Sequence, residues 1–190
     1  MKTFSSRERL EQALTRIADP KGEGAKACLT GNAARAAADA ADTRAKAGIS
    51  LGPLDGMILS IKDLFDAAAE PTRAGSKVLA DEAKPAAADA PVVRRLRAGG
   101  AVIVGKTNMT DFALGAIGAN PHFGTPANPR DRARVPGGSS SGAAVTVGDG
   151  MAEIAIRSDT GGSMRIPAAL CDIVGSSRAA SACRPRAHFR

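Results

Sequence analysis

Two glycine- and serine-rich runs govern the interpretation of this chain: PGGSSSG at residues 136–142 and SDTGGSMRIP at residues 158–167. Taken alone, the first run is typical of a flexible linker. In the second run, two glycines lead into Ser163 at the expected start of a helix. Successive backbone N–H groups in such a turn can point at one oxygen, so a serine there lies beside an oxyanion hole. The second run therefore indicates a serine nucleophile, which still needs a base.

Lys62 is the candidate base. It directly follows MILSI at residues 57–61, a short apolar run that predicts a buried strand. The simplest interpretation is a solvated lysine at a strand end, because a lysine with its ordinary pKa of about 10.4 is a poor base. Burial among neutral hydroxyl groups would lower that pKa and make Ser–Lys chemistry available. Only two histidines, His122 and His188, are present, so the sequence argues against a Ser-His-Asp triad and a multi-histidine metal site.

Around the two runs, helical and strand patterns alternate. Ser5 and Glu8 form a potential capping box for a first helix that ends near Asp19-Pro20. The alanine-rich residues 33–47 predict a second helix, and Asp89 is expected to cap a third that begins near Pro91. Further strands are expected at 101–104 and 152–156, and further helices at 143–147 and 164–170. The pattern predicts an α/β fold, a sheet covered by helices. Residues 115–142 are too long for an ordinary connection, which favours a functional loop.

Composition narrows the classes of function. A chain of 190 residues fits one domain and is long enough to bury a core. No apolar run spans a bilayer and no secretory signal is present, so the expected location is cytoplasmic. The net charge of +7 comes largely from the acid-free residues 176–190, and Trp and Tyr are absent, which makes nucleic-acid binding unlikely. Three cysteines argue against a disulfide framework.

Residues 100–107, GAVIVGKT, match the phosphate-loop pattern G-x-x-x-x-G-K-T. A phosphate loop needs a strand before the first glycine and a flexible turn between the glycines. Here the intervening Ala-Val-Ile-Val is itself the expected strand, and a helix precedes it. Lys106 is therefore interpreted as a strand-end residue rather than a phosphate ligand.

The motifs together resemble those of the amidase signature family. In the family's order they are GPLDG at 52–56 through Lys62-Asp63, GKTNM at 105–109, and the two glycine- and serine-rich runs. The resemblance covers roughly residues 50–175 and is specific, because several spaced motifs coincide.

The resemblance implies a Ser-cisSer-Lys triad made of Ser163, Ser139 and Lys62, acting on a carboxamide through an acyl-enzyme. Ser139 is chosen over its neighbours because its separation from Ser163 is the family's usual spacing. The implied oxyanion hole consists of backbone N–H groups of Thr160, Gly161 and Gly162. Ser140 is expected to hydrogen-bond near Lys62, and Asp159 to brace the loop.

The family's chemistry needs no metal or organic cofactor, and its substrate is a small-molecule amide. The implied fold is a mixed β-sheet core covered by helices, and a homodimer is compatible with it. Two alternative functions remain: a catalytically inactive fragment, and the A-type subunit of an amidotransferase that uses misacylated tRNA.

The chain also departs from the family. The resemblance implies that residues 1–175 form a truncated amidase signature domain, with the C-terminal half missing. Arg157 and Asp172 stand where the family commonly has glycine. After Gly175 the family continues Phe-Lys-Pro, whereas this chain has Ser-Ser-Arg, a replacement that loss of one nucleotide would explain. Residues 176–190, a basic segment with little apolar surface, are expected to be disordered and to take no part in chemistry.

Overall fold

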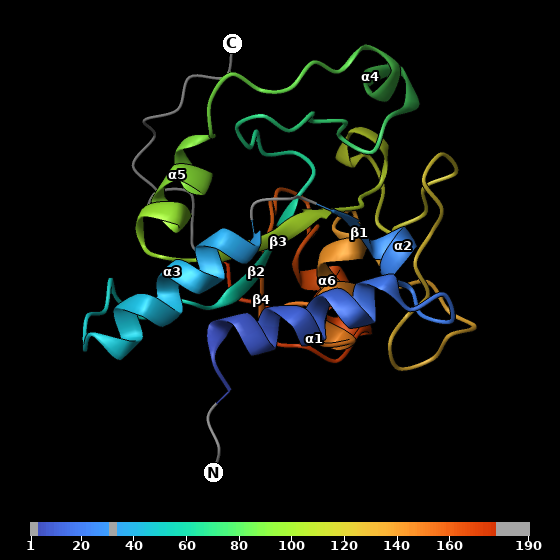
Figure 1. Cartoon of the computed structure of the whole chain (residues 1–190). Coiled ribbons are helices and arrows are strands. Elements are labelled where there is room, and N and C mark those ends of the chain that lie inside the picture. Colours follow the sequence, from blue (N-terminus) through green and yellow to red (C-terminus); the bar gives the residue numbers. More distant parts are fainter. Residues whose placement is uncertain (1–3, 31–33, 178–190) are drawn as a thin grey trace.

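The computed structural model describes residues 4–30 and 34–177 (Figure 1). The helices are α1 (Ser6–Ala18), α2 (Gly24–Ala27), α3 (Ala34–Lys46), α4 (Lys77–Glu82), α5 (Pro91–Ala98), α6 (Ser141–Gly148) and α7 (Arg165–Leu170), with a 3-10 turn at Asp111–Ala113. The strands are β1 (Cys28–Thr30), β2 (Ile58–Lys62), β3 (Val102–Thr107) and β4 (Ile154–Ile156). The fold is of the predicted α/β class.

The four strands form one mixed sheet in the order β1-β3-β2-β4. Strand β2 pairs in parallel with both β3 and β4, whereas β1 is antiparallel to β3. Parallel strands end at the same edge of a sheet, and ligands of open α/β sheets bind outside that edge. The carboxyl ends of β2, β3 and β4 therefore mark where a site is expected.

Helices cover both faces of the sheet, which explains why every residue of β2 is buried. Ile58 belongs to a core cluster with α1 and α3, which cross in front of the strands in Figure 1. Leu59 and Ile61 belong to a second cluster, with Val93 and Leu96 of α5. Successive side chains of a strand point to opposite faces, so this continuous apolar run serves both layers.

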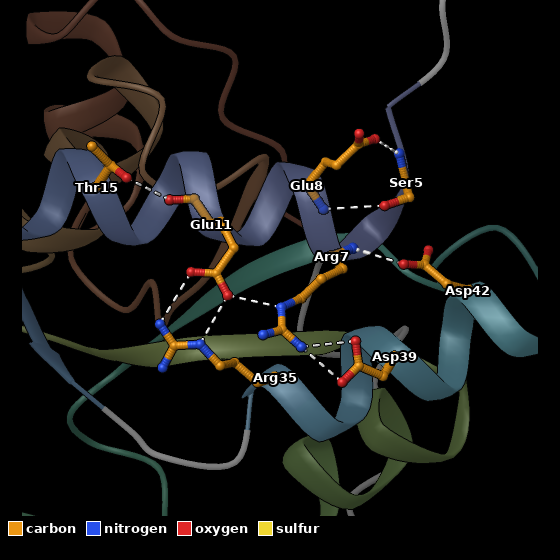
Figure 2. A network of polar contacts seen from close by, with 8 residues as sticks. All are labelled: Ser5, Arg7, Glu8, Glu11, Thr15, Arg35, Asp39 and Asp42. Carbon is orange, nitrogen blue, oxygen red and sulfur yellow. Dashed lines mark hydrogen bonds and ion pairs between the residues drawn. The ribbon is translucent and has the colours of Figure 1, made fainter.

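A polar network on the surface joins α1 to α3 (Figure 2). The predicted capping box is present, with Ser5 and Glu8 bonded reciprocally. Within α1, Arg7 pairs with Glu11. Between the helices, Arg7 pairs with Asp39 of α3, and Arg35 of α3 pairs with Glu11. These arginines lower the pKa of Glu11 to about 2. Exposed ion pairs contribute little stability, so the buried side chains beneath this network hold the helices together.

Most of the expected helices and strands are present, but the N-cap predicted for α5 was wrong. Helix α5 begins at Pro91, but its N-cap is Ala90, without a side-chain hydrogen bond. Asp89 instead accepts a hydrogen bond from the backbone N–H of Ala68 and pairs with Arg97. Three short elements, α2, β1 and α4, were not predicted, because each is too short to show a hydrophobic period.

The phosphate-loop match is not a phosphate loop. Its intervening residues lie in β3 or directly before it, as expected. Lys106 is almost fully buried and pairs with Asp63, with 2.7 Å between Nζ and Oδ1. The Lys106 ammonium also donates to the Pro71 carbonyl and to Thr72. Through these contacts Lys106 links the segment after β2 to the end of β3.

The segment after α7 passes close to β4, since Ile173 lines one groove together with Ile154 and Ile156. Asp172 has a φ of 53°, in the left-handed region that favours glycine and that aspartate tolerates better than most residues. Disorder was expected for residues 176–190, and most of that segment lies outside the described residues. Ser176 and Ser177, which are described, are exposed. Within the described ranges, no helix has the length and apolar character needed to cross a membrane.

Candidate active site

Four polar residues lie at or just beyond the ends of helices and strands. Lys62 is the last residue of β2, and Ser158 lies two residues after β4. Ser139 lies two residues before α6, and Ser163 two residues before α7. Hydrogen bonds join Lys62, Ser139 and Ser158, so two strand ends and the start of α6 meet at the carboxyl edge of the sheet.

The Lys62 ammonium is buried and contacts two serine hydroxyls. Its Nζ lies 2.7 Å from Ser139 Oγ and 3.1 Å from Ser158 Oγ, and the residue has no exposed surface. Burial, and secondarily the nearby Arg157 charge, lower the pKa of Lys62 to about 8, against an opposing effect of Asp159. A lysine of this kind is available as a neutral base near neutral pH.

The loop that carries Ser139 is tightly packed. The Gly138–Ser139 peptide is cis, as the family resemblance implied, and the Ser139 carbonyl accepts a hydrogen bond from the Thr110 backbone. A Cβ on Gly138 would lie 2.6 Å from the Gly118 nitrogen, so only glycine fits. Gly118 belongs to the long segment 115–142, which therefore folds back onto the serine run rather than forming a loose linker.

Asp159 organises the turn before Ser163. Its Oδ1 accepts a hydrogen bond from the backbone N–H of Gly162 at 2.8 Å, and its Oδ2 pairs with Arg165 at 2.8 Å. The Arg165 guanidinium holds the pKa of Asp159 below its ordinary value. Because the Gly162 N–H is engaged by Asp159, its expected role as an oxyanion donor is not supported by this geometry. Thr160 and Gly161 are exposed, and no acceptor in the described ranges engages their backbone N–H groups.

The hydroxyl groups of Ser163 and Ser140 make no hydrogen bond within the described part of the chain. Ser163 is partly buried in the turn before α7. Ser140 is fully buried and its Oγ has no partner in that part of the chain, so the expected contact with Lys62 was wrong. Ser158 makes that contact instead. The sequence held a partial signal for it, since Ser158 follows an expected strand, but the pairing of that strand with β2 is seen only in the structure.

No group of three or more His, Cys, Asp or Glu side chains in the described ranges is arranged to hold a metal ion. The polar groups that the structure brings together are two serine hydroxyls and one lysine amine, with a third serine on an adjacent turn. Serine hydroxyls beside a buried lysine of lowered pKa define the serine–lysine class of hydrolytic sites.

The chain belongs to the amidase family, whose model matches residues 8–177. It is 46% identical over 175 residues to the A-type subunit of the glutamyl-tRNA(Gln) amidotransferase from Anaeromyxobacter dehalogenans, covering 92% of this chain and 35% of the relative. It is 43% identical to AtzE, a 1-carboxybiuret hydrolase subunit from a Pseudomonas species, covering 90% of this chain and 37% of the relative.

Solved structures agree with these relatives. The peptide amidase of Stenotrophomonas maltophilia has a TM-score of 0.78 and 36% identity, covering 88% of this chain and 36% of that one. An s-triazine catabolic enzyme complex gives a TM-score of 0.81 at 41% identity, covering 88% of this chain and 37% of that one. The chain thus corresponds to somewhat more than a third of the length of its relatives.

Proposed function

We propose that this chain carries the catalytic triad of an amidase that hydrolyses the C–N bond of a small carboxamide through an acyl-enzyme. The observation that carries the proposal is the 2.7 Å contact between the buried Lys62 Nζ and Ser139 Oγ. A buried lysine of lowered pKa on a serine hydroxyl is the arrangement that activates a serine without histidine. Family membership supports the same chemistry.

In the proposed mechanism, Ser163 attacks the amide carbonyl while Ser139 accepts the Ser163 proton and passes its own to neutral Lys62. Backbone N–H groups of Thr160 and Gly161 hold the oxyanion. Collapse of the tetrahedral intermediate breaks the C–N bond, and the proton returns through Ser139 to the leaving amine. Water then attacks the acyl-enzyme with the same groups as base and acid, which yields carboxylic acid and free Ser163.

Ammonia release from acetamide and benzamide by the purified chain tests the proposal. Turnover, together with formation of the hydroxamate when hydroxylamine is added, would support an acyl-enzyme. A folded chain that hydrolyses none of these amides would contradict the proposal and favour the catalytically inactive fragment.

Ser158 is predicted to position Lys62. In Ser158→Ala, loss of one hydrogen bond to the ammonium should lower kcat/KM for benzamide about tenfold, in line with the energy of a charge-assisted hydrogen bond. Ser158→Thr retains the hydroxyl and should restore most of the activity. Equal kcat/KM and equal pH profiles for Ser158→Ala and the unmodified chain would show that the contact has no functional role.

A second candidate function is that of an A-type amidotransferase subunit, favoured by the 46% identity to the glutamyl-tRNA(Gln) amidotransferase relative. Such a protein would release ammonia from a donor amide for transfer to misacylated tRNA. Glutamine used as the sole competent amide would favour this function, whereas hydrolysis of benzamide and acetamide without glutamine turnover would favour the amidase.

We further propose that residues 1–175 form the amidase part of the chain and act in the cytoplasm. Cys28 and Cys171 are buried free thiols, which suits a reducing compartment.

A further inference from the structure

A groove beside the candidate active site has a lining that the proposed reaction does not use. It lies between β4 and the segment that follows α7, with a volume of about 330 Å³. Its apolar lining includes Ile154, Ile156 and Ile173, and Arg157 supplies its cationic group. Glu153 also lines it, with its carboxylate engaged by Arg9 and by the backbone N–H of Ile58. The volume is within the usual range of small-molecule pockets, and such pockets combine apolar walls with a few polar groups.

The Arg157 guanidinium lacks a counter-ion within the described residues. The nearest acid in the sequence, Asp159, is engaged by Arg165 and Gly162. Arg157 Nε is buried and donates to no acceptor in the described ranges. Burial lowers the pKa of Arg157 from its ordinary value, which reflects the cost of holding this charge away from water. An unmatched buried donor of this kind is uncommon and is stabilised when an acceptor reaches it.

We propose that this groove binds a small carboxylate with an apolar chain, the carboxylate on Arg157 and the chain against the isoleucines of β4. Guanidinium presents its N–H groups in a fork that matches a carboxylate. The apolar walls favour an aliphatic chain over an inorganic anion, since burying the chain removes apolar surface from water. The groove is distinct from the proposed triad, because none of Lys62, Ser139 and Ser163 lines it.

Met164 provides a local probe of occupancy. All three of Met109, Met151 and Met164 are buried, and of these only Met164 belongs to the groove lining. In the full chain labelled with ¹³C at the methionine methyl groups, titration with hexanoate should shift the Met164 signal and leave those of Met109 and Met151 in place. 1-Hexanol and hexylamine, which share the chain without the carboxylate and contain no amide bond, should bind at least about tenfold more weakly.

Arg157→Gln should weaken hexanoate binding by at least about tenfold, because it removes the charged partner. Arg94→Gln removes the same charge from the exposed face of α5 and should bind hexanoate as the unmodified chain does. Unchanged Met109 and Met151 signals in both variants show that the fold is retained. If the fold of Arg157→Gln fails, Arg157→Lys keeps the charge without the fork and should bind hexanoate more weakly than the unmodified chain.

Three results would each overturn the proposal. The first is an equal Met164 shift with hexanoate and 1-hexanol, which would make the groove a general apolar surface. The second is hexanoate binding that Arg157→Gln leaves unchanged. The third is a Met164 signal that hexanoate does not move. None of these results depends on turnover of an amide, so failure of the groove proposal and failure of the proposed function are distinguishable.

Discussion

Replacing Ser163 by alanine is expected to lower kcat/KM for benzamide by roughly 10⁴-fold or more. Residues of a hydrolytic triad act as a unit, and loss of the nucleophile leaves only the contribution of the oxyanion hole and of substrate binding. Ser163 lies at the turn where Asp159 holds the backbone of Gly162, so the substitution removes one hydroxyl and leaves the turn braced. Ammonia release by the purified variant measures the effect.

Ser50→Ala is the matched control, because Ser50 is exposed on a loop remote in sequence from both serine runs. It should retain full activity. Mass spectrometry of the chain with a slowly hydrolysed ester should find an acyl adduct on the unmodified chain and on Ser50→Ala, and none on Ser163→Ala. Turnover that survives in Ser163→Ala, or an adduct on Ser139, would assign the nucleophile elsewhere.

The parts of the site fixed by local chemistry could be predicted from sequence. Lys62 follows a short apolar run, and such a run predicts a buried strand without any knowledge of its neighbours in the sheet. The capping box at Ser5 depends on residues three apart and holds in any context.

What escaped prediction depends on contacts between distant segments. Ser140 was expected near Lys62, and the parallel pairing of β2 with β4 brings Ser158 to Lys62 instead. Asp89 is well placed to cap α5, but the approach of Ala68 and Arg97 engages its carboxylate instead. The Gly162 N–H was expected to face substrate, and the turn directs it to Asp159.

Lys62 links stability to function through its burial. Because its pKa is lowered in the folded chain, the folded state binds fewer protons than the unfolded state between pH of about 8 and about 10.5. The contribution of Lys62 to the free energy of unfolding therefore rises with pH between these two values. Below pH of about 8 the buried ammonium lowers the free energy of unfolding. The difference between the two pKa values corresponds to about 3 kcal/mol. The lowered pKa also makes the Lys62 amine available as a base, so the loss of stability accompanies the proposed catalytic role.

Replacing Lys62 by methionine, which has a similar length and no charge, should separate these effects. Activity on benzamide should fall by roughly 10⁴-fold, as for loss of another triad member. At pH 7 the free energy of unfolding, measured by urea denaturation, should rise by up to about 3 kcal/mol, and the gain should shrink as the pH rises from about 8 toward 10.5. In the unmodified chain, kcat/KM should increase with pH up to about 8, as the neutral amine forms.

The control is Lys77→Met, at an exposed position of α4, which should change neither the activity nor the free energy of unfolding. A Lys62→Met chain that keeps its activity, or a stability gain independent of pH, would show that Lys62 is not the buried base.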